Sequence, residues 1–167
     1  MERGSESLSE QTTVYDASGK ILGRLASQVA KEMISARKSG SQQRVIIINA
    51  EGAIVSGPRS KVFSDYRAKY KLNHARKGPF FPRMPDKIIK RTVRGMLPYQ
   101  KNSSGRGALR DLRVMIGTPP NLSGEDLPEG HQWGETANID QAPPNKFVRL
   151  GDISSHLGVD ASRWGGE

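Results

Sequence analysis

The stretch RVIIIN, residues 44–49, decides the fold class because it is a continuous apolar run. A half-exposed strand alternates apolar and polar residues, whereas a parallel strand that is covered on both faces is apolar throughout. Upstream, TTVYDA at 12–17 predicts a short strand. Between the two, residues 22–34 keep apolar side chains at helical spacing, and Gly40 lies beyond the predicted end of that helix. The sequence therefore predicts a β-α-β unit, whose crossover is nearly always right-handed.

This unit predicts an α/β fold with three layers, in which helices cover both sides of a small, mostly parallel sheet. Further strands are predicted at AIVSG, 53–57, and at LRVMIG, 112–117, with a flexible turn at Gly105–Gly107 and a brief helix at 108–112 before the second of them. The predicted organisation is a disordered N-terminus at 1–11, an α/β domain at 12–120 with a basic arm at 59–86, an irregular, acidic, Pro-rich linker at 121–145, and a C-terminal strand and short helix at 146–167.

Charge is distributed very unevenly along the chain, whose formal net charge is +9. Residues 1–58 carry +1, residues 59–120 carry +13, and residues 121–167 carry −5. A generic basic protein has no need for one intensely cationic third. This distribution is typical of a protein that binds the phosphate backbone of a nucleic acid.

The stretch KIIKRTVRGMLPYQK, residues 87–101, carries five Lys or Arg and no acidic residue. At helical spacing Lys87, Lys90, Arg91 and Arg94 share one face, and Ile89, Val93, Met96 and Leu97 gather on the opposite side. Pro85 suits the first helical turn and Pro98 ends the pattern. The alternative is a solvated surface helix, but such a helix normally mixes positive and negative charges, so the pattern favours a nucleic-acid face.

Aromatic residues alternate with cations in the basic arm and follow the helix: Tyr66, Tyr70, Phe80, Phe81 and Tyr99. The arm is too polar for a core segment, and its prolines predict a constrained loop in its second half. Each aromatic ring could stack on a base or could pack within the loop. An irregular cationic arm beside a basic helix favours folded RNA over duplex DNA, which calls for an inserted recognition helix.

Nucleotide-binding and catalytic motifs are incomplete. GAIVSG at 52–57 has the two glycines of a P-loop, but Pro58 and Arg59 occupy the positions of the required Lys and Ser or Thr. SGKILGRLAS at 18–27 predicts a tight turn that leads into a helix. A small nucleotide-binding enzyme, the main alternative from another class, is therefore supported only by the β-α-β start.

Metal-binding and membrane-spanning patterns are also absent from the sequence. His74, His131 and His156 lack paired ligand spacing, and there is no cysteine. Asp152, Ser154, Ser155 and His156 are close in sequence, but such proximity is not the geometry of a catalytic triad. No run approaches the length of a membrane span or has the pattern of a secretory signal. We predict a soluble cytoplasmic protein that has no catalytic residue, metal, cofactor, small-molecule substrate or membrane partner.

Four segments together resemble the family of the thirteenth protein of the large ribosomal subunit. They are GRLAS at 23–27, INAEGAIVSG at 48–57, RTVRGMLP at 91–98 and GRGALRDLRVMIG at 105–117, and the likeness covers residues 13–120 in order and spacing. KGPFFPRMP before RTVRGMLP, and FVRLGDISSHLG at 147–158, are similar to the archaeal and eukaryotic branch of the family. The chain departs from that pattern in its acidic insertion at 121–145 and in its short segment after Gly158.

The resemblance implies a structural protein of the large ribosomal subunit that binds and organises ribosomal RNA, supports subunit assembly, contacts neighbouring ribosomal proteins and has no catalytic activity. The cations that match the family motifs are Arg24, Arg91, Arg94, Arg106 and Arg110. Helical periodicity adds Lys87 and Lys90, and the charge count adds Arg59, Lys61, Arg67, Lys69, Lys71, Arg76, Lys77, Arg83 and Lys101. The same cations would equally serve a free RNA-binding regulator that works off the ribosome.

Overall fold

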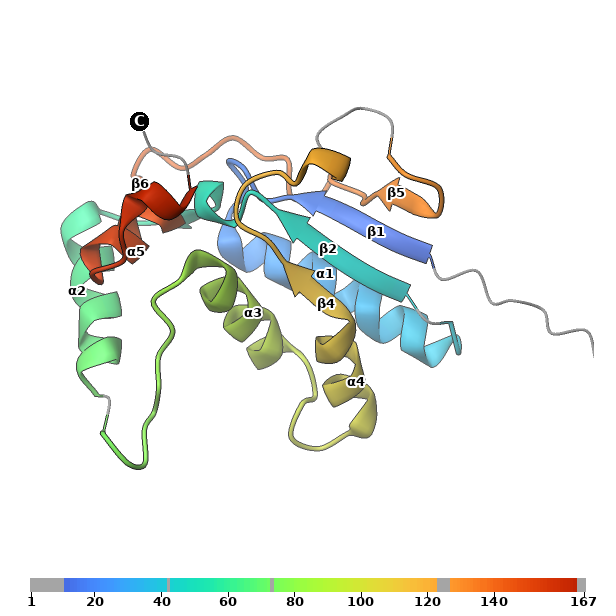
Figure 1. Cartoon of the computed structure of the whole chain (residues 1–167), viewed down its shortest axis with the longest axis horizontal. Coiled ribbons are helices and arrows are strands. Elements are labelled where there is room, and N and C mark those ends of the chain that lie inside the picture. Colours follow the sequence, from blue (N-terminus) through green and yellow to red (C-terminus); the bar gives the residue numbers. More distant parts are fainter. Residues whose placement is uncertain (1–10, 42, 73, 123–126, 165–167) are drawn as a thin grey trace, which may run out of the picture.

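The computed structural model describes residues 11–41, 43–72, 74–122 and 127–164 (Figure 1). The first ten residues, for which the sequence predicts disorder, lie outside this range. Gln11, the last residue of the predicted disordered N-terminus, already belongs to the first strand, β1 (Gln11–Asp16).

A four-stranded parallel sheet organises the fold, as Figure 1 shows. Its strand order is β4-β2-β1-β5, where β2 is Gln43–Ile48, β4 is Leu112–Val114 and β5 is His131–Trp133. Helix α1 (Leu22–Lys38) connects β1 to β2, so the predicted β-α-β unit is confirmed. The α/β class and the mostly parallel sheet are confirmed with it.

The two faces of the sheet are covered unequally. Val45 and Ile47 belong to the large core cluster, to which every described α-helix contributes buried apolar side chains. On the other face Val14 and Ile48 pack with Leu122, which belongs to a short 3₁₀ turn, η2 (Pro120–Leu122). Both faces of β2 are therefore covered, as its apolar run predicts. Within the described residues, however, the layer opposite the α-helices is this 3₁₀ turn and its flanks rather than a second set of α-helices.

Three helices follow the short strand β3 (Ile54–Ser56) along the chain: α2 (Arg59–Lys71), α3 (Pro85–Met96) and α4 (Ser103–Asp111). Helix α3 begins at Pro85 and ends before Pro98, as predicted. Its buried side is formed by Ile88, Ile89 and Val93, and Leu97 is buried just beyond its end. The helical pattern also assigns Met96 to the buried side. That prediction is wrong, because the Met96 side chain is 42% exposed.

Two segments that were predicted to be irregular are helical. The first half of the basic arm forms α2, because Val62 and Tyr66 are one turn apart and bury their side chains in the core. Gly105 and Gly107, predicted to flank a flexible turn, lie inside α4. A Cβ atom on Gly105 would come within 2.6 Å of the Pro98 carbonyl oxygen, so this glycine allows close packing rather than flexibility.

The segment 121–145 is not merely an irregular linker. It supplies β5, which pairs with β1 in parallel register, and Ile139, whose side chain is 2% exposed. Downstream, β6 (Phe147–Arg149) pairs antiparallel with β3, and α5 (Leu150–His156) follows. The short 3₁₀ helices η1 (Ala50–Gly52) and η3 (Ala161–Trp164) complete the described elements.

Candidate nucleic-acid interface

Helix α3 presents a basic edge opposite its buried side. Lys87 and Arg94 are exposed and Arg91 is half-buried. Lys90 is different, because its ammonium donates a hydrogen bond to the carbonyl oxygen of Leu112 at 3.0 Å. The prediction that all four cations share one free face is therefore wrong for Lys90, which is half-buried beside β4.

The basic arm carries eight more exposed cations on α2 and on the loop that leads to α3. These are Arg59, Lys61, Arg67, Lys69, Lys71, Arg76, Lys77 and Arg83. Within residues 59–72 and 74–110, Asp65 and Asp86 are the only acidic residues, and no cation of this range is held in an ion pair. So many uncompensated cations favour a polyanionic partner.

Aromatic rings hold several of these cations in place. The ring of Phe81 lies between α2 and α3, with Lys69 Nζ at 5.9 Å and the Arg91 guanidinium at 5.0 Å from its centroid. Lys69 also lies 5.0 Å from the centroid of the Tyr66 ring, which meets Phe81 edge-on. Each such contact contributes about 0.5–1 kcal/mol at an exposed site, so the rings fix where the charges point.

The predicted base-stacking role is therefore wrong for Tyr66, which is a core residue. Burial raises the pKa of its hydroxyl and leaves little of its ring accessible. Tyr70 and Tyr99 are half-buried beneath the guanidinium groups of Arg83 and Arg94, at 5.6 and 5.5 Å. Phe80 is 61% exposed, so base stacking stays a prediction for this ring.

Two open hollows lined by cations lie along α3 and the turn that follows it. One, of about 290 Å³, is bordered by Phe80, Lys87, Arg91 and Arg94. The other, of about 500 Å³, lies at the turn after α3 and is bordered by Arg94, Tyr99 and Lys101 among others. Fixed cations around a concave surface suit the phosphates of a folded strand.

Helix α4 extends the same surface. Arg106 and Arg110 are exposed, and Arg106 donates to the carbonyl oxygen of Tyr99 at 3.4 Å. We call the whole the basic surface: Arg59, Lys61, Arg67, Lys69, Lys71, Arg76, Lys77, Arg83, Lys87, Arg91, Arg94, Lys101, Arg106 and Arg110. In Figure 1 its elements, α2, the loop, α3 and α4, occupy the left and lower parts of the molecule.

Two arginines lie outside the basic surface as defined above. Arg24 on α1 is exposed and forms a hydrogen bond to Gln141, in the acidic segment, and its RNA contact stays a prediction. Arg113 is exposed on β4 between two apolar neighbours, next to α3 and α4. Arg113 stands between two apolar residues of a predicted strand, and this alternation could have identified it as an exposed cation.

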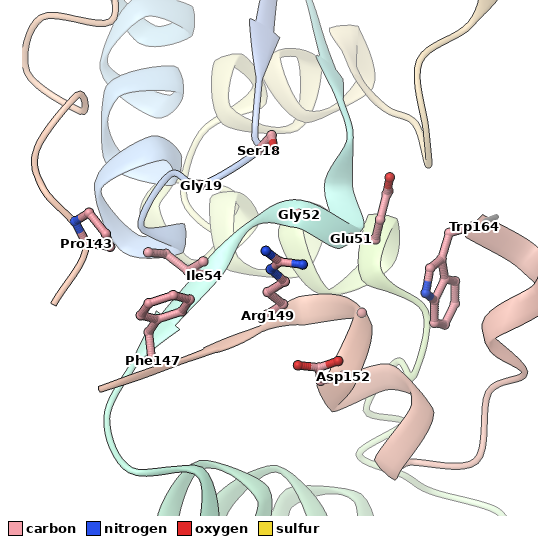
Figure 2. Close-up of a pocket in the computed structure, with 11 residues that line it drawn as sticks. Ser18, Gly19, Glu51, Gly52, Ile54, Pro143, Phe147, Arg149, Asp152 and Trp164 are labelled. Carbon is pink, nitrogen blue, oxygen red and sulfur yellow. The ribbon is translucent and has the colours of Figure 1, made fainter. Parts of the chain in front are cut away.

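A hollow of a different character lies beyond the carboxyl ends of β1 and β2, and Figure 2 shows its lining. It measures about 460 Å³ and contains Arg149, Asp152 and Trp164 together with the Ser18–Gly19 turn. Glu51 points away from Asp152, because its carboxylate accepts the N–H of Gly117 at 3.0 Å. The glycines of the incomplete P-loop flank β3 here, and Gly52 borders the hollow as the end of η1, so the predicted strand reading of that motif is confirmed.

His156 and Ser154, the remaining candidates for catalytic chemistry, pack against other parts of the fold. The imidazole of His156 stacks on Phe63 with ring centroids 4.3 Å apart, and Ser154 is fully buried. In the described part of the chain, no group of three or more His, Cys, Asp or Glu side chains could hold a metal ion. No helix there is long and apolar enough to cross a membrane.

Comparison with known proteins identifies the family. The family profile of ribosomal protein L13 matches residues 10–121. The large ribosomal subunit protein uL13 of Archaeoglobus fulgidus is 42% identical over 154 residues, which cover 92% of this chain and 92% of the relative. The proteins of the same name from Methanosarcina barkeri and Methanococcoides burtonii are 40% and 41% identical, and each match covers 87% of this chain and 97% of the relative. The chain therefore belongs to the ribosomal protein L13 family, in its archaeal branch.

Proposed function

We propose that the chain is a structural constituent of the large ribosomal subunit, where its basic surface binds and organises folded ribosomal RNA. The observation that carries this proposal is the set of cations between residues 59 and 110, which form no ion pair among the described residues. Family membership supports the ribosomal setting, because the relatives are named as large-subunit proteins.

The mechanism is neutralisation of phosphate repulsion by charges in fixed positions. Lys69 and Arg91 rest against one ring, Phe81, so both side chains are partly ordered before RNA binds. Less side-chain entropy is then lost on binding than with free lysines and arginines. Rigid cations on a curved surface bring RNA segments together and so support folding of the RNA during assembly.

RNA suits this surface better than a DNA duplex. Helix α3 buries one side in the core, and the loop before it lies alongside its exposed edge, with Phe80 accepting a hydrogen bond from Arg91 at 3.3 Å. A helix flanked in this way offers shape and charge to an irregular RNA junction rather than a projecting recognition helix for a major groove.

Salt dependence of binding tests the proposal. If about 6–10 phosphates are neutralised, affinity of the full chain for a large-subunit RNA fragment should fall by about 10³–10⁵ between roughly 50 and 200 mM salt. A flat response would contradict the proposal. Sedimentation of native lysate separates the settings: recovery with the large subunit supports the ribosomal role, and recovery at the top of the gradient supports a free RNA-binding regulator instead.

A further inference from the structure

Strand β5 forms the outer edge of the sheet, on the side remote from the basic surface. The sheet order β4-β2-β1-β5 places β4 at one edge, against α3, and β5 at the other. In Figure 1, β5 lies at the upper right of the molecule, far from α4 and the loop before α3. An activity at this edge would therefore not compete with RNA for the same residues.

One residue of β5 has backbone groups without a partner among the described residues. Thr12 donates to the carbonyl oxygen of Gly130 at 3.0 Å, and Gly134 donates to that of Val14 at 2.9 Å. In a parallel strand, successive residues direct their backbone groups alternately to one side and the other. Gly130, Gln132 and Gly134 therefore direct backbone groups toward β1, while the N–H and C=O of Trp133 point outward. No described residue supplies a partner for those two groups of Trp133.

The side chains of β5 do not protect this edge. Sheet edges that face water are commonly protected by lysine, proline, a bulge or a very short strand. Strand β5 has three residues, and the last of them is Trp133, whose side chain is 46% exposed. Its register partner is Val14, which belongs to the small cluster on the thinly covered face, so the Trp133 side chain is expected on that face. The residue also borders the hollow between β5 and α1. An exposed tryptophan next to backbone groups that no described residue pairs is typical of an interaction site.

The other face of the same edge is acidic. A hollow of about 430 Å³ between β5 and α1 is bordered by Glu32 and Glu135, with Lys31 as its single cation. Glu32 accepts hydrogen bonds from the Tyr15 hydroxyl and the Gln43 amide, and in the described structure neither glutamate forms an ion pair. Burial, the hydrogen bond and charge of Glu32, and the charge of Glu135 together raise the pKa of Tyr15, so both carboxylates act on one ring.

We propose that β5 is a docking edge for an extended, Lys- or Arg-rich segment of another protein, which adds to the sheet as a further strand. Main-chain bonds to Trp133 would supply affinity, and alternate side chains of the added strand would supply specificity. On one face a cation would stack on the Trp133 indole, and on the other it would meet Glu32 and Glu135.

Charge identifies this occupant among the other candidates. Glu32 and Glu135 border this edge and Lys31 is the single cation of the same hollow, so an RNA strand would be repelled. A second copy of the chain would bring two such acidic edges together. The inference rests on the proposed function for its setting, in which the partner is a neighbouring protein of the large subunit.

Site-specific cross-linking in assembled subunits tests the proposal. Because the chain has no cysteine, Gln132→Cys and Lys77→Cys each create a unique attachment point for a short photo-reactive cross-linker. Gln132 lies on β5 with its backbone bonded to β1, and Lys77 lies on the basic surface. Each variant is incorporated into large subunits, irradiated, and the attached partner is sequenced by mass spectrometry.

Cross-linking of Gln132→Cys to a Lys- or Arg-rich extended segment of another protein is the expected result, and its yield should fall at least about tenfold when Trp133→Ala and Glu135→Gln are added. Attachment to RNA, to a second copy, to a segment that is not basic, or to nothing would overturn the inference. Lys77→Cys should attach to RNA in the same particles. If it does while Gln132→Cys fails, the docking edge is wrong and the proposed function stands; if subunits exclude both variants and the unmodified chain, the proposed function fails.

Discussion

Lys90 and Leu112 tie α3 to β4 through a side-chain to backbone hydrogen bond of 3.0 Å. Lys90 occupies the same helical stripe as Lys87 and Arg94, yet its ammonium is directed at a strand carbonyl rather than at solvent. One of the four cations therefore stabilises the fold, while its neighbours remain available to a ligand.

Replacing each lysine of this stripe by methionine should separate the two roles. Lys90→Met removes a hydrogen bond and should lower the free energy of unfolding by about 1 kcal/mol, with little effect on RNA affinity. Lys87→Met should change stability by less than about 0.5 kcal/mol, but should reduce the slope of log affinity against log salt by about 0.9. Urea unfolding and filter binding measure the two effects, and a reversed pattern would place Lys90 on the RNA instead.

Two helical glycines in the basic region should respond oppositely to alanine. In Gly105→Ala the new Cβ would lie 2.6 Å from the carbonyl carbon and oxygen of Pro98, which are backbone atoms that cannot easily move. Unfolding free energy should fall by about 1–3 kcal/mol. Gly95→Ala is the matched control, because it has open space around its Cβ position and should gain about 0.4–1 kcal/mol. Equal effects in thermal unfolding would contradict the close packing of α4 on the Pro98 turn.

Periodicity identified the elements whose pattern is local. The apolar run of β2 and the stripe of α1 each depend on one segment, so the sequence predicts them with nearly correct ends. The sequence does not predict β5, because a three-residue strand owes its pairing to β1, more than a hundred residues earlier in the chain. Long-range pairing of short strands leaves almost no local signal.

In the candidate site, too, local patterns are predictable from sequence and long-range contacts are not. Charge counting located the cationic third of the chain, but it could not distinguish Lys90, whose partner is a carbonyl group on another element. It also could not show that Tyr66 is a core residue, because its spacing from Val62 is an isolated helical signal among many polar neighbours. Sequence predicts where charge accumulates, and tertiary packing decides which charges are free.

Phe80 should bind a base, if any aromatic residue of the arm does. Phe80→Ala should weaken binding to a large-subunit RNA fragment by about 1–3 kcal/mol and leave the salt slope unchanged, because stacking involves no counterion release. Leu72→Ala is the control, since Leu72 begins the same loop, is 69% exposed and has no ring. Equal losses in both variants would indicate nonspecific apolar contact rather than stacking.

The Tyr15 hydroxyl should make stability depend on pH in the alkaline range. Burial, followed by the hydrogen bond to Glu32, raises the pKa of Tyr15 well above its ordinary value of about 10. Above pH 10 the unfolded chain loses this proton while the folded chain keeps it, so the unfolded state binds fewer protons and the free energy of unfolding falls as pH rises. Tyr15→Phe removes that contribution. The variant should be less stable than the wild type by about 1 kcal/mol near neutral pH, because Glu32 loses a donor. The difference should stay constant up to about pH 10 and should narrow as the pH is raised further.

Urea unfolding at a series of pH values measures this narrowing, and Tyr99→Phe, at a half-buried tyrosine outside the core cluster, is the control for general alkaline effects on the chain. Lysines and arginines are unchanged in both variants, so their titration cancels in the comparison with the wild type. A Tyr15→Phe difference that stays constant across the range would mean that Tyr15 ionises alike in the folded and unfolded chains. A difference that widens would require the opposite sign, with the tyrosinate favoured in the folded state. That outcome is incompatible with a hydroxyl that donates to Glu32 beside the charge of Glu135.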